Sequence, residues 1–166
     1  SIKDFKDLKT RTYDANSANF INTSGGSAVA LPWGEVYSAL RTGLVNSVVT
    51  SSASGKDGKF WEVLDHFTKI NYAYPLQALT INLDYWDALD KSQQKALLKA
   101  AAAVEKDQWE KVKIEDKKSL KVLSDKGVTI HEASASLKKE LDIMATKMLD
   151  TYLDNSNYEI DKIFNS

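Results

Sequence analysis

The clearest pattern of apolar and polar positions lies in residues 31–50, where helical spacing gives way to a valine-rich run. The helical part covers residues 35–41, and its apolar positions are Val36, Ala39 and Leu40. Gly43 is expected to end this helix, because glycine adopts the left-handed backbone that helix ends require. The run after it predicts a strand over residues 44–49 that ends at the polar Thr50. A helix followed by such a strand is typical of ligand crevices in open α/β sheets.

The rest of the first half of the chain predicts shorter elements. We expect a linker over residues 1–8, strands over 9–13 and 27–31, and a short helix within 14–24. Further along, we expect a flexible loop over residues 51–58, a helix over 59–67 and a strand over 77–83. The helix over 59–67 carries its apolar residues on one face: Phe60, Val63, Leu64 and Phe67.

The longest predicted helix runs from Lys91 to about Lys126, and no proline or glycine interrupts it. Asp90 and Gln93 have the spacing of a capping box at its start. At 1.5 Å per residue, such a helix is roughly 50 Å long. An approximate apolar stripe follows it, formed by Leu98, Ala101, Trp109, Val112, Leu120 and Leu123. A helix longer than a small domain is expected to lie across several elements or to pair with another helix.

The end of the chain predicts one more strand and one more long helix. Gly127 ends the preceding helix, and residues 128–131 predict a short strand. Ser134 is expected to cap a helix over residues 135–153. The predicted inward positions of this helix are Leu137, Leu141, Met144, Met148 and Leu149. Residues 159–164 predict a last turn or two of helix.

Composition excludes several classes of protein. The chain is 43% apolar and 27% charged, which is typical of an ordinary globular protein. Its net charge of -1 gives no reason to expect a nucleic acid or an anionic membrane as partner. No apolar run approaches the roughly 20 residues of a membrane span. There is no cysteine, which excludes disulfides and thiolate catalysis, and no signal peptide opens the chain, as in a mature secreted protein.

Signals for catalysis or for a metal are weak. The two histidines, His66 and His131, lie far apart in the sequence, and His66 is interpreted as a surface residue. His131 adjoins Glu132, but no second histidine has helical spacing, so we expect no metal site and no cofactor. Carboxylates such as Glu35 and Asp14 could still meet in the folded chain, which leaves an enzyme as an open alternative.

A family resemblance rests on residues between Trp33 and Ser47: Trp33, Glu35, Val36, Tyr37, Ala39, Leu40, Arg41, Gly43, Val45, Asn46 and Ser47. They match most of the pattern aromatic-x-Glu-Val-Tyr-x-Ala-Leu-Gln-x-Gly-x-Val-Asp-Gly. The stretch therefore resembles the DctP-type solute-binding proteins of tripartite ATP-independent periplasmic (TRAP) transporters. Arg41 replaces the glutamine of the pattern, and Asn46-Ser47 replaces Asp-Gly. Residues 1–11 resemble a second family pattern, Ser-x-x-Asp-x-Lys-Gly-Leu-Lys-x-Arg, with Asp7 in place of its glycine.

The resemblance implies a set of substrate-binding residues. Arg11 matches the arginine that grips the substrate carboxylate, and a guanidinium pairs bidentately with such a group. Without the resemblance, Arg11 is better explained as a surface arginine at a strand end. Trp33 is expected to form a flat wall beside the ligand. Without the resemblance, it is equally an ordinary aromatic residue of the core. Thr50 is expected to add a hydrogen bond, and Asp14 and Tyr74 complete the predicted site.

The resemblance also implies the fold class. It indicates an α/β lobe like that of a type II periplasmic solute receptor, with a long bracing helix and a largely missing N-terminal lobe. We expect a substrate-binding lobe over residues 1–75 and a strand and long helix that bridge to the missing lobe over 76–126. Residues 127–166 are expected to return to the first lobe and to add C-terminal helices. On this interpretation the chain is truncated and matches only the C-terminal portion of the family's receptors.

The implied function is that of a periplasmic receptor, not an enzyme, which binds an organic acid anion and works with membrane permease subunits. Exposed apolar surface is expected near Leu79, Ile81, Tyr85 and Trp86 and on the long helix. Such a surface predicts a homodimer of the truncated chain. The alternative function is a helical self-association module without a ligand, built on residues 90–126.

Overall fold

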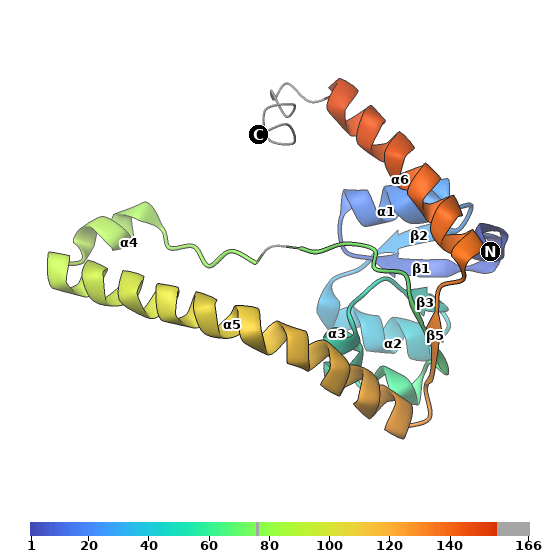
Figure 1. The fold of residues 1–166 in the computed structure, drawn as a ribbon, viewed down its shortest axis with the longest axis horizontal. Coiled ribbons are helices and arrows are strands. Elements are labelled where there is room, and N and C mark those ends of the chain that lie inside the picture. The colour runs from blue at the N-terminus through green and yellow to red at the C-terminus, as the bar shows by residue number, and fades with distance from the viewer. Residues whose placement is uncertain (76, 156–166) are drawn as a thin grey trace.

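Three short parallel strands form the first sheet of the computed structural model, which describes residues 1–75 and 77–155 (Figure 1). Strand β1 (Lys9–Thr12) lies between β2 (Ser27–Ala30) and β3 (Ser47–Val48). The predicted strands over residues 9–13 and 27–31 are therefore confirmed. The third strand is shorter than predicted, because the Val45 N–H donates back to the Ala39 carbonyl oxygen of α2 at 3.2 Å and the ladder begins only after it.

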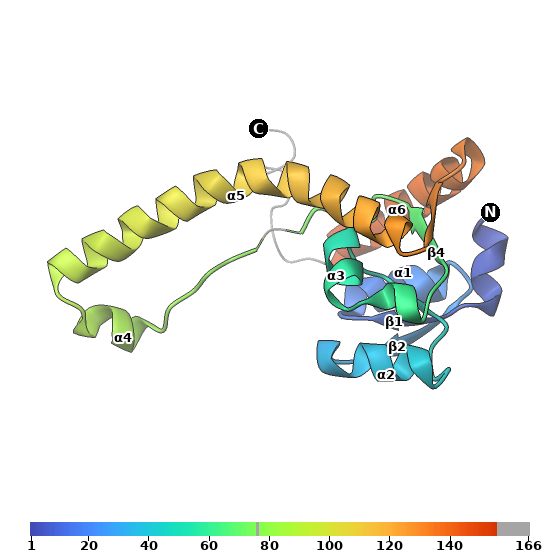
Figure 2. The ribbon, with the colours of Figure 1, turned by 90° about the horizontal axis from the view of Figure 1, so that it is seen from below.

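Helices cover both faces of this sheet (Figure 2). One face packs against α1 (Ala15–Thr23) and α6 (Ala135–Asn155), and the other against η2 (Trp33–Glu35) and α2 (Val36–Arg41). Successive side chains of β2 point to opposite faces of the sheet: Ala28 packs on the side of α1 and α6, and Val29 packs on the side of α2. A parallel sheet with two covered faces is the arrangement expected of an α/β fold.

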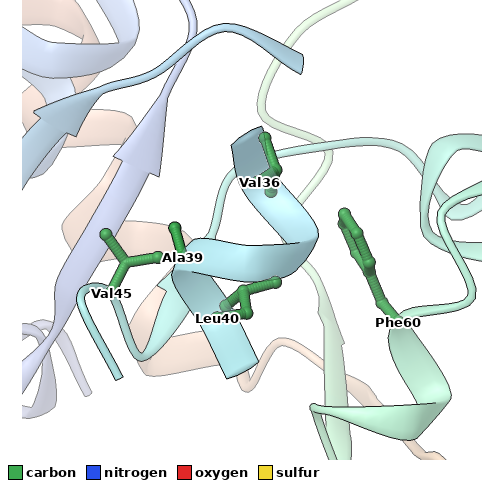
Figure 3. Close-up of a cluster of buried hydrophobic side chains, with 5 residues drawn as sticks. All are labelled: Val36, Ala39, Leu40, Val45 and Phe60. Carbon is green, nitrogen blue, oxygen red and sulfur yellow. The ribbon is translucent and has the colours of Figure 1, made fainter. Parts of the chain in front are cut away.

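The core on the α2 side holds the residues whose spacing predicted a helix (Figure 3). Its buried members are Val36, Ala39, Leu40, Val45 and Phe60. Gly43 ends the helical segment with a positive φ of 73°, as its position predicts. Burying one large apolar side chain stabilises a fold by about 1.5–3 kcal/mol, so this cluster is enough to hold α2 on the sheet.

A second, two-stranded parallel sheet joins β4 (His66–Lys69) to β5 (Thr129–Glu132). The predicted strand near residues 128–131 is confirmed, but the predicted helix over 59–67 is wrong. Lys59 has a positive φ of 53°, only η3 (Phe60–Glu62) is helical, and β4 follows. The backbone groups of β4 bond to β5, a partner 63 residues away that local spacing does not reveal.

Two further segments are more ordered than predicted. Helix α3 (Ser52–Asp57) replaces the predicted flexible loop, and its start is capped by the Ser51 hydroxyl, which accepts from the Ser54 backbone N–H at 3.1 Å. The 3-10 helix η1 (Ile2–Asp7) replaces the predicted linker at the start of the chain. Helix α3 packs against the long helix, which accounts for its order.

The predicted strand over residues 77–83 is also wrong. Residues 77–82 form no ladder, and α4 (Leu83–Ala88) begins where the strand was expected to end. A strand requires a neighbour, and no part of the described chain offers this segment one. Leu79 is accordingly 97% exposed.

Helix α5 (Lys91–Asp125) confirms the predicted long helix and its capping box at Asp90. Its 35 residues extend about 52 Å. The C-terminal half packs on α3, where Leu123 is 2% exposed, whereas α4 and the N-terminal half extend away from both sheets (Figures 1 and 2). Leu98 and Trp109 of this helix are exposed, as are Leu79, Ile81 and Tyr85, which confirms most of the predicted apolar surface. Trp86, predicted with them, is partly buried.

Helix α6 confirms the second long helix. Ser134 caps it, since its hydroxyl accepts from the Leu137 N–H at 3.2 Å. Leu137 and Met144 are buried, but Leu149 is 44% exposed, so its predicted inward position is wrong. The predicted turns over 159–164 lie outside the described residues. No helix in the described part of the chain has the length and apolar character needed to cross a membrane.

Candidate functional site

The candidate site lies at the carboxyl edge of the first sheet. The strand order β2-β1-β3 means that the chain leaves β1 toward one neighbour and later returns to its other side. In open parallel sheets of this order, ligands bind in the crevice beyond the carboxyl ends of the first and third strands. Arg11 lies near the end of β1, and Thr50 follows the end of β3.

Arg11 is the most unusual residue at this edge, because its side chain is only 5% exposed. The guanidinium Nε donates to the Leu31 carbonyl oxygen at 3.1 Å, which fixes its plane. Within residues 1–75 and 77–155, no carboxylate forms an ion pair with it. Burial lowers the pKa of Arg11 from its ordinary value, but an arginine stays charged at physiological pH. A buried cation without an anion is costly, so a negatively charged group bound at this edge would lower that cost.

Two aromatic rings flank the guanidinium. Its central carbon lies 5.8 Å from the centre of the Trp33 ring and 5.9 Å from that of Tyr13, within the range of cation–π attraction. Trp33 is 46% exposed and Tyr13 is 48% exposed, so both rings still present surface to solvent. The Phe60 ring supports Trp33 from the core, with 5.6 Å between the ring centres. The arrangement combines a fixed positive charge with apolar walls.

Thr50 lies beside Arg11 at the same edge. The backbone N–H of the preceding Val49 donates to the Arg11 carbonyl oxygen at 3.1 Å, which ties the end of β3 to β1. The Thr50 side chain is half-buried, and among the described residues its hydroxyl has no hydrogen-bond partner. The hydroxyl therefore retains both a donor and an acceptor for a bound group.

The other two predicted site residues have different surroundings. The Asp14 carboxylate caps α1, where it accepts from the Ser17 N–H at 2.7 Å and from the Ser17 hydroxyl at 2.6 Å. Tyr74 is 88% exposed in the segment that follows β4 and leads out of the second sheet. The structure thus brings Arg11, Trp33 and Thr50 to one edge, leaves Asp14 next to them as a helix cap, and shows no contact between Tyr74 and the guanidinium.

Two tyrosines at this edge were missed by sequence reasoning. Tyr13 follows Arg11 by two residues, and the period of a strand could have placed both on one face. Tyr72 packs on Phe20 with 4.7 Å between the ring centres. Burial, followed by the nearby Tyr13 and Asp14, raises the pKa of Tyr72 to about 12. Both tyrosines are therefore neutral hydrogen-bonding groups at physiological pH.

The arrangement at Arg11 is open. A hollow of about 560 Å³ lies between α3 and α5, and another of about 210 Å³ lies beside α2. Neither is lined by Arg11, Trp33 or Thr50, so neither belongs to this site. The described residues also hold no group of three or more side chains arranged to bind a metal ion.

Comparison with known proteins gives one family. The profile of the DctP family, described as bacterial extracellular solute-binding protein, family 7, matches residues 1–155. The C4-dicarboxylate-binding periplasmic protein DctP of Rhodobacter capsulatus is 29% identical over 149 residues, which make up 89% of this chain and 45% of that protein. The sialic acid-binding periplasmic protein SiaP of Vibrio cholerae is 27% identical over 151 residues, or 86% of this chain and 47% of that protein.

A solved structure shares the fold. The crystal structure of an extracytoplasmic solute receptor from Bordetella pertussis that binds pyroglutamic acid superimposes with a TM-score of 0.86 and 26% identity. The match covers 95% of this chain and 52% of that one. The chain thus spans about half the length of the relatives it matches.

Proposed function

The chain belongs to family 7 of the bacterial extracellular solute-binding proteins. We propose that the sheet edge with Arg11, Trp33 and Thr50, called here the Arg11 wall, forms one side of a cleft that binds an organic acid anion. The relatives are substrate-binding proteins of transporters, not enzymes. No catalytic step is therefore needed at this site, and its chemistry is recognition.

The observation that carries this proposal is the buried, unpaired guanidinium of Arg11. Its Nε–H donates to the Leu31 carbonyl oxygen, and no described residue accepts a hydrogen bond from the two terminal nitrogens of the guanidinium. A carboxylate there would accept two parallel hydrogen bonds. Hydrogen bonds to charged groups contribute about 1.5–3 kcal/mol each, enough to select an acid over a neutral analogue.

The flanking groups support an acid with an apolar or planar body. The Trp33 and Tyr13 rings would pack against that body, and the Thr50 hydroxyl would bond to a polar substituent. The relatives are described as binding C4-dicarboxylates, sialic acid and pyroglutamic acid, all of which carry a carboxylate. We carry the shared carboxylate over to this chain, and no particular one of these acids.

Location and partners follow from the family. The curated relatives are periplasmic, so we propose the periplasm for this protein and a membrane permease of the TRAP type as its partner. Closure of a second lobe over the Arg11 wall would signal to that permease, as in hinged receptors generally. Because the chain spans about half of its relatives' length, the site described here is one wall of such a cleft.

A thermal-shift screen against organic acids tests the proposal. Parent chain and Arg11→Met are heated with succinate, sialic acid, pyroglutamate or the neutral amide of pyroglutamate. A ligand at 100 times its Kd adds roughly 2.7 kcal/mol to the free energy of unfolding. We expect an upward shift with at least one acid, none with the amide, and none in Arg11→Met. An equal shift with the amide or in Arg11→Met would refute recognition through Arg11.

The exposed apolar surface favours a second candidate, self-association without a ligand. Leu98 and Trp109 of α5 and Tyr85 of α4 are each more than half exposed. A surface of this kind is a common site of pairing between copies of one chain. Sedimentation velocity at rising concentration would show a dimer if this candidate is right. A monomer throughout would leave the receptor as the better interpretation.

A further inference from the structure

Two histidines that are distant in sequence meet on the outer face of the second sheet. His66 Nδ1 lies 3.1 Å from His131 Nε2, and the ring centres are 5.2 Å apart. The ladder pairs His66 with Thr129 and Thr68 with His131, so the histidines are diagonal neighbours on parallel strands. All four of these residues are exposed, whereas Phe67 and Ile130 between them are partly buried. The two imidazoles therefore share one solvent-facing surface.

We propose that His66 and His131 form a chelating site for a divalent first-row transition-metal ion, with Cu²⁺ and Zn²⁺ as the best-suited ions. A zinc–nitrogen bond is about 2.0–2.1 Å, so two nitrogens bound to one ion at angles of 90° to 109° lie about 2.8–3.4 Å apart. The observed separation of 3.1 Å falls within this interval. Because both rings are exposed, modest rotation about χ2 can aim both lone pairs at one ion.

No other group competes strongly for these nitrogens. Among the described residues, each imidazole has its hydrogen bond and its ring contact with the other imidazole, so the metal would replace the proton they share. The adjacent Glu132 is already paired with Lys69. The described chain supplies no third side chain for the ion, and water would fill the remaining positions. Imidazole suits copper and zinc, and copper binds more tightly than zinc in most such sites.

Metal binding here would link β4 to β5. The two strands are joined through α4 and α5, and the ion would bridge them directly at their exposed face. The paired imidazoles exist only in the folded chain, since 65 residues separate them in sequence. Added metal should therefore raise the unfolding temperature, and the rise should require both histidines.

Isothermal titration of the whole chain with ZnCl₂ and with CuCl₂ tests the proposal. We expect one ion per chain, with tighter binding of copper. His66→Gln and His131→Gln should each weaken binding by about tenfold or more, because even outer-shell changes weaken metal sites by 10–100-fold. Thr129→Ala changes the same face without removing a nitrogen, and it should bind like the parent. Circular dichroism confirms that each variant is folded.

Electron paramagnetic resonance of the copper-loaded chain gives a second readout. The parent should show coupling to two imidazole nitrogens, and each single variant coupling to one. The proposal is overturned if the double variant binds either ion as tightly as the parent, or if the parent binds neither ion. It is also overturned if copper in the parent couples to a single nitrogen.

Discussion

Replacing Leu123 with alanine tests how α5 is anchored. Leu123 is 2% exposed and lies where the C-terminal half of α5 meets α3. A methyl group placed on Gly55 of α3 would lie 3.6 Å from Leu123 Cδ1, so the two helices are already in close contact. Ser52 and Asp116 add a hydrogen bond of 2.6 Å across the same junction. The side chain thus fills a packed interface whose backbone has little room to collapse.

The expected loss follows from what the substitution removes. Leucine loses three carbon atoms, and at about 0.8 kcal/mol for each buried methylene the transfer term is about 2.4 kcal/mol. The cavity left behind adds to this, and buried Leu→Ala changes cost about 2–5 kcal/mol in all. We therefore expect Leu123→Ala to lower the free energy of unfolding by about 3–4 kcal/mol.

Leu98→Ala provides a matched control on the same helix. Leu98 is 61% exposed, so its replacement should change the free energy of unfolding by less than about 0.5 kcal/mol. Urea unfolding followed by circular dichroism measures both variants at one low concentration. A similar loss in the two would contradict this reasoning, because it would mean that the N-terminal half of α5 is buried in solution. Repeating the pair at higher concentration would then show whether self-association buries it.

Three other changes have defined outcomes. Gly26→Ala should lower the free energy of unfolding, measured in urea, by about 1–3 kcal/mol, because the new Cβ would lie 2.9 Å from the Phe5 carbonyl oxygen. Gly34→Ala is the control: there is open space around Gly34, so its replacement should be near neutral. The pKa of Tyr72 is raised from its ordinary value of 10.0 to about 12, so its contribution to stability is complete below pH 10 and is lost as the pH rises toward 12. Alkaline unfolding should show a smaller pH dependence in Tyr72→Phe, and an unchanged profile would contradict that pKa. The pKa of Glu115 is lowered, mainly by its hydrogen bond from Lys56 of α3. Its contribution to the free energy of unfolding is therefore present above about pH 4.5 and is lost as the pH falls through the lower pKa of the folded state. Acid unfolding of Glu115→Gln should therefore be less pH-dependent below pH 4.5, and a steeper profile would count against the ion pair.

Elements with local signals were predictable from sequence. The capping box at Asp90, the absence of breakers up to Lys126 and the glycine at position 43 each act within a few residues, and each is confirmed. The α/β receptor fold, indicated by the motif near Trp33, is confirmed by the family match and the solved relative. The helix signals depend on a few neighbouring residues, and the fold was indicated by one short motif, so both can be recognised in a single sequence.

Elements that depend on distant partners were not predictable. Residues 59–67 look helical by spacing, but residues 66–69 form a strand because β5 pairs with them. Residues 77–83 look like a strand but lack any partner in the described chain. Ser-rich residues 51–58 look flexible but form α3 because α5 packs on them. The meeting of His66 with His131 has the same origin, since only the ladder brings them together.

The candidate site was predictable in part. Arg11, Trp33 and Thr50 were chosen through the family resemblance, and the structure places all three at one sheet edge. Burial of Arg11 to 5% exposure could not be read from a strand-end arginine, because it depends on the rings that flank it. The role of Asp14 as a helix cap had a sequence signal in Ser17, three residues later.

The most direct test of anion recognition observes the Arg11 side chain itself. The Nε–H group is held by the Leu31 carbonyl, so its NMR signal reports on any ligand that reaches the same guanidinium. The signal is followed as pyroglutamate or its neutral amide is added to about 10 mM. At that concentration even a ligand with a Kd of about 1 mM, or ~4 kcal/mol of binding free energy, occupies most of the sites. We predict a saturable shift with the acid and none with the amide. An unmoved Arg11 signal while other resonances saturate would place the acid elsewhere and contradict the account.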